Sequence, residues 1–313
     1  MRIALFHHAR LPVPKYGGTE RIIVWLCQGL VELGHEVTLL AGKGSRVPGV
    51  RVVEIDPAEV LAPGFEVRRH APGVELLHYH TPVAHPPDLP WLWTLHGNMR
   101  PGLTAGPHAV CVSADHARRH GTETYVLNGV RLDEYEFRTE KGEYDLFLGR
   151  LHRVKGWGIA VEAAKRRRFR LVVAGGWRPS LSRWVTFAGE VGGDRKRDLL
   201  AGACCLWSPV QWDDPCPVSL IESLASGTPV IGAPRGGIPE IVGSDGGGLG
   251  SSLEEWLALR DRLGDWPPEA CRRRAERSFT HLRMTRDYLR IYEHLLAHGN
   301  LPGGRALDER TEG

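Results

Sequence analysis

The chain has 313 residues, enough for two α/β domains of ordinary size, and its 42% apolar and 25% charged residues are typical of a globular protein. A net charge of +3 gives no reason to expect nucleic acid as a partner. No apolar run approaches the roughly 20 residues that span a bilayer, and a strand begins directly after Met1, so we expect neither a membrane helix nor a signal peptide. None of the six cysteines forms a Cys-x-x-Cys pair, which favours reduced thiols in a cytoplasmic protein. Peripheral contact with the inner face of the membrane stays open.

The first half of the chain alternates apolar strands with helices. A strand over residues 3–7 is followed by a loop and then by a helix over 19–33, whose apolar residues recur on one face. Gly34 is typical of a residue that ends a helix. Residues 58–73 carry only a weak pattern. Further strands are expected over 36–40, 50–54, 75–79, 91–95, 109–112 and 125–127.

The second half restarts this alternation after a polar hinge at 138–142. The expected strands are 144–148, 170–174, 185–188, 204–207 and 229–231. The expected helices are 156–167, 194–201, 218–226 and a long helical tail over 253–298. Alternation in both halves predicts an α/β protein with two Rossmann-like, doubly wound domains, each a parallel sheet covered by helices. The polar end, 299–313, is predicted to be disordered.

The stretch from Pro209 to Gly232 is the most informative about function. Two carboxylates, Asp214 and Glu222, flank a turn rich in proline and small residues, and Glu222 should lie on the short helix that this turn opens. Such a turn directs backbone N–H groups and the positive end of the helix at an anion. A carboxylate within the helix can accept hydrogen bonds from ribose hydroxyls. The alternative is a surface loop before a capped helix.

Three further motifs follow strands. Gly149 and Arg150, with Lys155 shortly after, combine a guanidinium fork and a point charge that suit a diphosphate; ordinary surface charge is the alternative. The Gly17-Gly18 pair lies between the first strand and the first helix, where glycine lets the backbone approach an anion closely, although a plain turn has the same composition.

His96 ends a predicted strand, just before Gly97. A histidine there can donate to a sugar hydroxyl or to developing charge, and a structural histidine is the alternative. His78 and His80 point the same way on their strand and, with His85, suggest a metal site. No carboxylate or cysteine completes such a set, so no metal is expected.

These motifs, in this order, resemble those of the retaining glycosyltransferases of family 4, which have the GT-B fold: two Rossmann-like domains facing a cleft. The family's signature is an acidic residue, seven residues, then Glu, followed by a helix and Gly-Thr-Pro-Val. Here Asp214 stands where the family usually has Glu, and Glu222 takes the second position. Pro217 stands where the family often has Gly, so a backbone donor is missing there or shifted to Val218 and Ser219.

The resemblance implies a role for each motif. Arg150 and Lys155 would hold the donor diphosphate and neutralise the leaving group, with Gly149 in the same turn. His96 would lie beside the transferred sugar, and Gly17 and Gly18 near the donor. The remaining implied donor-binding residues are Glu190 and Val191 at the nucleobase, Pro217, Val218 and Ser219 at the sugar or phosphate, and Glu222 at the ribose, with Asp214 catalytic.

The resemblance also implies the domain roles. Residues 1–138 would form the acceptor-side domain, completed by a C-terminal helix, 284–298, that crosses back onto it. Residues 139–283 would form the nucleotide-sugar-binding domain.

The function implied is retaining transfer from a UDP- or GDP-sugar to a hydroxyl acceptor, with no metal ion and no cofactor. The acceptor is open between a saccharide, a lipid-linked molecule and a small molecule. The departures at Asp214 and Pro217 keep two alternatives open: a non-catalytic or degenerate nucleotide-sugar-binding subunit, and a GT-B epimerase or hydrolase of nucleotide sugars.

Overall fold

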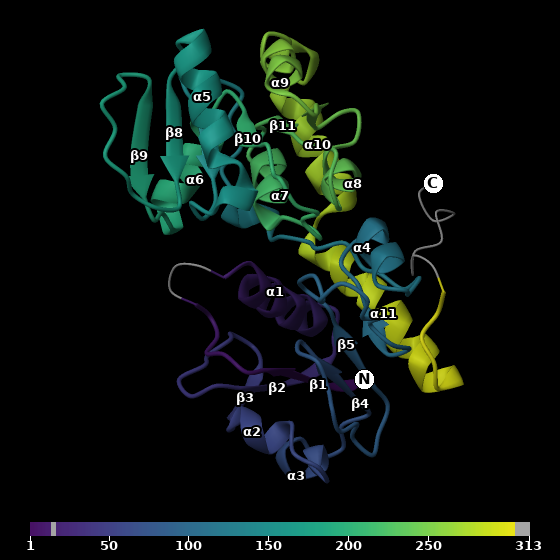
Figure 1. The fold of residues 1–313 in the computed structure, drawn as a ribbon. Coiled ribbons are helices and arrows are strands. Elements are labelled where there is room, and N and C mark those ends of the chain that lie inside the picture. Colours follow the sequence, from purple (N-terminus) through teal and green to yellow (C-terminus); the bar gives the residue numbers. More distant parts are fainter. Residues whose placement is uncertain (14–16, 304–313) are drawn as a thin grey trace. The chain divides into compact units, whose positions relative to one another are not determined.

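The computed structural model describes residues 1–13 and 17–303, and the chain folds into two compact units (Figure 1). The first unit comprises Met1–Gly129 and the segment from His281 onward, and the second is Val130–Thr280. The division therefore falls before the predicted hinge at 138–142.

The boundary between the units falls before Val130 because residues 130–138 form hydrogen bonds with the rest of the second unit. The Tyr135 hydroxyl donates to Glu222 at 2.7 Å, and the backbone N–H of Arg138 donates to the carbonyl of Ser226.

A six-stranded sheet forms the centre of the first unit, and all its strands are parallel. Its order is β3-β2-β1-β4-β5-β6. The strands are β1 (Arg2–His7), β2 (Glu36–Ala41), β3 (Arg51–Glu54), β4 (Leu76–Tyr79), β5 (Trp91–Thr94) and β6 (Ala109–Val110). The helices are α1 (Gly18–Glu32), α2 (Pro57–Val60), α3 (Val67–His70), α4 (Ala114–Arg119) and α11 (His281–His298).

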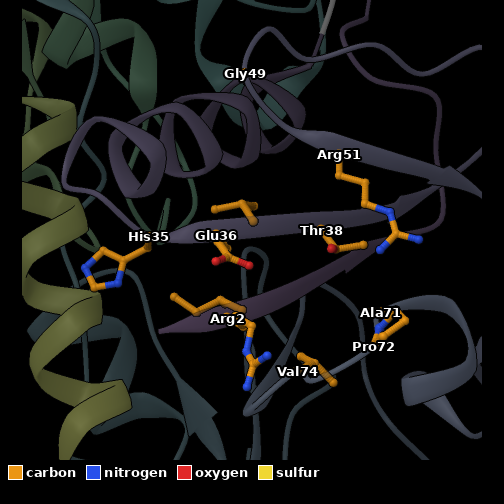
Figure 2. A pocket seen from close by; sticks show the side chains of 11 residues that line it. Arg2, His35, Glu36, Thr38, Gly49, Arg51, Ala71, Pro72 and Val74 are labelled. Atoms are coloured by element: carbon orange, nitrogen blue, oxygen red, sulfur yellow. The ribbon is translucent and has the colours of Figure 1, made fainter.

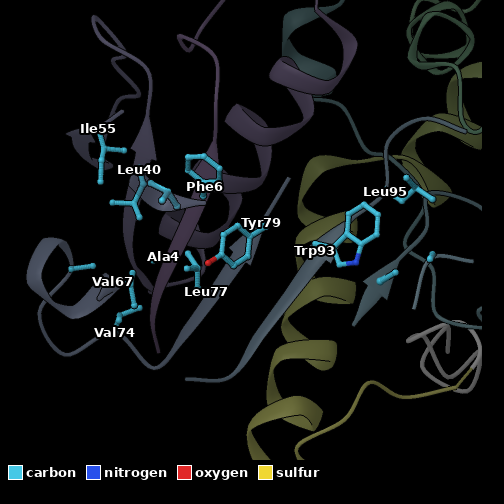
Figure 3. Close-up of a cluster of buried hydrophobic side chains, with 14 of the residues drawn as sticks. Ala4, Phe6, Leu40, Ile55, Val67, Val74, Leu77, Tyr79, Trp93 and Leu95 are labelled. Atoms are coloured by element: carbon cyan, nitrogen blue, oxygen red, sulfur yellow. The ribbon is translucent and has the colours of Figure 1, made fainter. Parts of the chain in front are cut away.

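Alternate residues of the strands build the hydrophobic core of this unit. Ala4 and Phe6 of β1 and Leu77 and Tyr79 of β4 contribute to one buried cluster, which Figure 3 shows between the strands. The amphipathic helices α1 and α11 pack against each other. Gly29 of α1 permits this approach, because a side chain there would overlap the Thr285 hydroxyl of α11.

The second unit repeats the same design. Its parallel sheet has the order β12-β11-β10-β7-β8-β9, which in its own numbering is the 3-2-1-4-5-6 order of the first sheet. The strands are β7 (Asp145–Leu148), β8 (Leu171–Ala174), β9 (Val185–Gly189), β10 (Leu206–Ser208), β11 (Val230–Gly232) and β12 (Gly247–Leu249). The helices are α5 (Trp157–Arg167), α6 (Gly193–Gly202), α7 (Val218–Ala225), α8 (Ile238–Val242), α9 (Leu253–Arg260) and α10 (Pro268–Ser278). Short 3₁₀ turns lie at Leu132–Glu134, Arg153–Lys155 and Leu263–Asp265.

Several sequence predictions need correction. Residues 125–127 form no strand, since only Tyr125 makes an isolated bridge, to Cys111. The tail over 253–298 is three helices, because Pro267 and Pro268 interrupt it and a further break precedes His281. Strand β12 and helix α8 were not predicted, and residues 58–73 contain most of α2 and all of α3.

The predicted disordered tail is also partly placed against the first unit. The N–H of Gly299 donates to the carbonyl of Leu295, and the Thr124 hydroxyl donates to the carbonyl of Pro302. Residues 304–313 lie outside the described residues. No described helix is long and apolar enough to cross a membrane.

Ligands of doubly wound sheets bind at the carboxyl ends of the strands. A hollow of about 330 Å³ lies at the opposite side of the first sheet, at the amino ends of its strands. Figure 2 shows Arg2, Glu36 and Arg51, which begin β1, β2 and β3, around this hollow. Its position separates it from the residues that the sequence singles out.

Candidate active site

The predicted phosphate-binding residues meet at the topological switch point of the second sheet. Strands β7 and β10 are neighbours at its centre, and the chain leaves them toward opposite sides, to β8 and to β11. Doubly wound folds bind their ligands in a crevice beyond the carboxyl ends of strands that diverge in this way. Gly149 and Arg150 follow β7, and the loop at 209–217 follows β10.

Two glycines let the backbones at this crevice pack closely. Gly156 has a φ of 75°, and a side chain on it would overlap the carbonyl oxygen of Pro209. Gly236 has a φ of 58°, and a side chain there would overlap the backbone of Asp214. The N–H of Gly237 donates to the Asp214 carbonyl at 2.9 Å. The loop at 209–217 is therefore fixed by backbone contacts on both sides.

Lys155 and Asp214 form an ion pair in this crevice. The Lys155 Nζ lies 2.5 Å from Asp214 Oδ2, and it also lies 4.8 Å from the centre of the Trp212 ring. The Asp214 side chain is 8% exposed and that of Lys155 is 24% exposed, so solvent screens the pair only in part. A 2.7 Å hydrogen bond from Gln211 N–H to the Val154 carbonyl joins the two loops that carry them.

Arg150 provides a second positive charge at the end of β7. Its side chain is exposed, and within residues 1–13 and 17–303 it forms no ion pair. Asp214 offsets part of the charge of Lys155, whereas Arg150 adds a positive charge next to this pair in the sequence. Sequence analysis placed both cations here but did not predict that one of them would be paired.

The N-terminus of α7 faces the same loop. Pro217 is its N-cap residue, and Val218 and Ser219 begin the helix, all three half-buried. N–H groups in the first turn of a helix lack acceptors within the helix, so those of Val218 and Ser219 are suited to an anion. Ser219 also carries a hydroxyl, which is able to donate one hydrogen bond.

Glu222 is placed differently from the expectation of an accessible ribose acceptor. Its side chain is 1% exposed, and Oε1 accepts from Lys196 Nζ at 2.6 Å and from the Tyr135 hydroxyl at 2.7 Å. A ribose contact therefore requires the carboxylate to become accessible from this buried position, and it stays a prediction. Sequence analysis missed Lys196 and Tyr135, because neither belongs to a recognisable motif.

The predicted nucleobase segment follows β9. Gly189 has a φ of 72°, and its carbonyl accepts from Gly175 N–H at 2.7 Å, which fixes the turn beside β8. Glu190 is exposed, whereas Val191 is only 6% exposed and packs into the protein. A base-binding role of this turn therefore rests on its backbone and on Glu190 more than on the Val191 side chain.

At the carboxyl edge of the first sheet, Gly17 and Gly18 open α1. Gly17 is the N-cap residue, and its carbonyl accepts from the Arg21 guanidinium at 3.2 Å. The Glu20 carboxylate in the first turn lies 3.9 Å from His7 Nε2 at the end of β1. This neighbour lowers the pKa of Glu20 below its ordinary value, so a carboxylate already occupies the positive end of α1.

His96 follows β5 and belongs to a cluster of neutral histidines. Its Nε2 lies 2.9 Å from Nδ1 of His80, and the two rings stack 5.2 Å apart. Surrounding protein lowers the pKa of His96 to about 3, first by desolvation and then through the nearby His7. Burial holds the pKa of His80 well below its ordinary range as well. In the neutral pair one ring nitrogen donates and the other accepts, so the tautomers of His80 and His96 depend on each other.

His78 and His80, two of the three histidines that suggested a metal site, have other partners. His78 Nδ1 and Nε2 each lie 2.7 Å from a hydroxyl oxygen, of Tyr292 and of Thr94 respectively. His80 pairs with His96, and His85 is exposed. Among the described residues, no group of three or more His, Cys, Asp or Glu side chains could hold a metal ion.

The fold agrees with the comparisons to known proteins. Residues 143–258 match the family model of glycosyl transferases group 1. The crystal structure of AviGT4, a glycosyltransferase involved in avilamycin A biosynthesis, superposes with a TM-score of 0.79 and 27% identity, over 96% of this chain and 99% of that one. The fold is GT-B, and the protein is a glycosyltransferase.

More distant structures share the fold of this glycosyltransferase. Sucrose-phosphate synthase from Thermosynechococcus elongatus has a TM-score of 0.72 at 17% identity, over 95% of this chain and 99% of that one. Anabaena HepE in complex with UDP has a TM-score of 0.70 at 14% identity, over 94% of this chain and 100% of that one. No curated protein sequence matches the glycosyltransferase significantly.

Proposed function

We propose that the protein transfers a sugar, with retention of configuration, from a UDP- or GDP-sugar to a hydroxyl acceptor, as a member of glycosyltransferase family 4. The observation that carries the proposal is the crevice of the second sheet, where Arg150, the Lys155–Asp214 pair and the N-terminus of α7 converge. The structural neighbour HepE was crystallised with UDP and with UDP-glucose, which supports a uridine donor.

The residues at this crevice suit departure of a diphosphate. The bond between the anomeric carbon and the diphosphate oxygen breaks, and the negative charge moves to the leaving diphosphate. Arg150, Lys155 and the first N–H groups of α7 stabilise that charge. The acceptor oxygen then attacks the anomeric carbon from the same face, and its proton passes to the departing oxygen, so configuration is retained.

Positive side chains take the place of a divalent cation in this proposal. Such ions often hold the phosphates of a donor and neutralise the leaving group. Here Arg150 and Lys155 supply the positive charge. Asp214 keeps Lys155 in place and leaves its remaining N–H donors for the ligand.

The test is calorimetric titration of the Arg150→Ala variant with UDP and GDP. A charge-assisted hydrogen bond is worth about 1.5–3 kcal/mol, so diphosphate affinity should fall at least about tenfold. Uridine and guanosine, which lack the diphosphate, should bind parent and variant alike. Arg170→Ala is the matched control, because Arg170 is exposed next to the amino end of β8, away from the crevice. Equal diphosphate affinity of Arg150→Ala and parent would refute the assignment.

One rival activity has to be distinguished from sugar transfer. A hydrolase or epimerase of nucleotide sugars would use the same diphosphate site but would consume the donor without an acceptor. Incubation of UDP-glucose with and without acceptor separates these activities, with mass spectrometry to detect transfer or hydrolysis and NMR to detect the isomeric product of an epimerase. Acceptor-dependent product supports transfer, and full donor consumption without acceptor supports the rival.

A further inference from the structure

The first unit has a hollow beyond the carboxyl end of β5, next to His96. Its volume is about 470 Å³. Most of its lining comes from one segment that leaves the strand, residues 95–103.

Apolar side chains make up most of the wall of this hollow. Trp93 and Leu95 alternate along the strand direction and so share a face, as Figure 3 shows. Met99 and Leu103 come from the segment that follows. Leu103 is 53% exposed, which leaves apolar surface in contact with water in the unliganded protein.

Hydrogen bonds with α4 and with His120, which follows it, fix the segment that lines this hollow. His116 Nε2 lies 3.2 Å from the carbonyl oxygen of Gly97, and the Arg119 guanidinium donates to Asn98 Oδ1 at 3.2 Å. The N–H of Ala105 donates to the carbonyl of His120 at 2.9 Å. A lining segment tied down at several points forms a site that needs little reordering on binding.

The polar side chains that line the hollow are those of Thr94, His96, Asn98 and Arg100. His96 has one ring nitrogen beside His80 and its other edge among the lining residues. The Thr94 hydroxyl lies 2.7 Å from His78 and 2.9 Å from the Tyr288 hydroxyl, so it is already engaged. Asn98 and Arg100 are exposed, and none of the described residues that line the hollow is a carboxylate. This lining offers few partners for a ligand with hydroxyl groups all round.

We propose that this hollow binds the acceptor, and that the acceptor carries an apolar body, an aromatic ring or an alkyl chain, next to the hydroxyl that is glycosylated. The inference rests on the proposed function and names its acceptor class. The apolar body lies on Trp93, Leu95, Met99 and Leu103, and the hydroxyl end lies toward His96. A bare saccharide would bury hydroxyl groups against these side chains without partners and would bind weakly.

The test uses methyl, hexyl and phenyl β-glucoside, which share their sugar hydroxyls and differ only in the apolar group. Binding to the full chain is measured by calorimetry, so no turnover is needed. We expect the hexyl or phenyl glucoside to bind at least about tenfold more tightly than methyl glucoside, and the ratio between them tells an alkyl from an aromatic site.

Two variants of Leu103 test whether the glucosides bind in this hollow. Leu103→Asp should remove the preference for the apolar glucosides, whereas Leu103→Phe should keep it. Leu181→Asp is the control, because Leu181 is a fully exposed leucine of the second unit. Equal binding of the three glucosides, no binding of any, or a preference that survives in Leu103→Asp would overturn the proposal. UDP titration of the same samples tests the donor site separately, so failure of the acceptor inference is distinguishable from failure of the proposed function.

Discussion

Replacing Lys196 by methionine should destabilise the second unit strongly, because it leaves the buried Glu222 carboxylate without its positively charged partner. The Glu222 side chain is 1% exposed and that of Lys196 is 14% exposed, so water compensates little for a lost partner. Removing one member of a buried ion pair costs about 3–5 kcal/mol. The Tyr135 hydroxyl still donates to Glu222, which places the expected loss at the lower end, about 3 kcal/mol.

The double variant Lys196→Met with Glu222→Gln measures the pair itself. Replacing both charges leaves no stranded ion, and stability should return to within about 1 kcal/mol of the parent. Arg167→Met is the matched control, since Arg167 forms an exposed pair with Asp261, 2.8 Å apart. Exposed pairs contribute less than about 1 kcal/mol.

Scanning calorimetry of the four proteins provides the readout. For a unit of this size, a loss of about 3 kcal/mol lowers the Tm by about 6–12 °C. Amide hydrogen exchange in α7 assigns the change to the second unit, because Glu222 lies in that helix. A Lys196→Met variant no less stable than Arg167→Met, or a double variant no better than the single one, would refute the reasoning.

Three further predictions concern the crevice and the histidines. Gly156→Ala should abolish nucleotide affinity in calorimetry, because its methyl group overlaps the Pro209 carbonyl and displaces Lys155, whereas Gly158→Ala, in open space in the helix that Gly156 precedes, should leave affinity unchanged. EDTA should not reduce initial transfer rates, since Arg150 and Lys155 neutralise the diphosphate; inhibition that magnesium or manganese reverses would contradict this. The free energy of unfolding should fall as the pH drops below about 6.5, by up to about 1.4 kcal/mol per pH unit for each such histidine, because His80 and His96 stay neutral when folded but take up protons when unfolded. Denaturant titrations from pH 7.5 to 4.5 measure this slope, and a flat profile would contradict it.

Local sequence patterns predicted the loop and the helix that carry the candidate site residues, but not the contacts between residues far apart in the chain. Asp214 and Glu222 could be placed from the sequence because their spacing, turn and helix lie within one continuous stretch. The partners of Glu222 could not, since Lys196 is 26 residues away and Tyr135 is 87 residues away. Strand β12 was not predicted for a related reason. Its Gly-Gly-Leu sequence has little strand propensity, and the strand forms only because it pairs with β11.

The pairing of Lys155 with Asp214 was missed because it depends on two loops meeting. Each residue was singled out from its own motif, and only the adjacency of β7 and β10 in the sheet brings the two within 2.5 Å. Boundaries of the regular strands were close to those observed, because buried parallel strands are short apolar runs with clear flanking turns.

The backbone anchoring of the 209–217 loop has a consequence for protein engineering. Its backbone is held by Gln211 N–H on the Val154 carbonyl and by Gly237 N–H on the Asp214 carbonyl. Positions 217–219 can therefore be randomised together to select altered donor preference, while Gly156 and Gly236 are held constant as the scaffold of every variant.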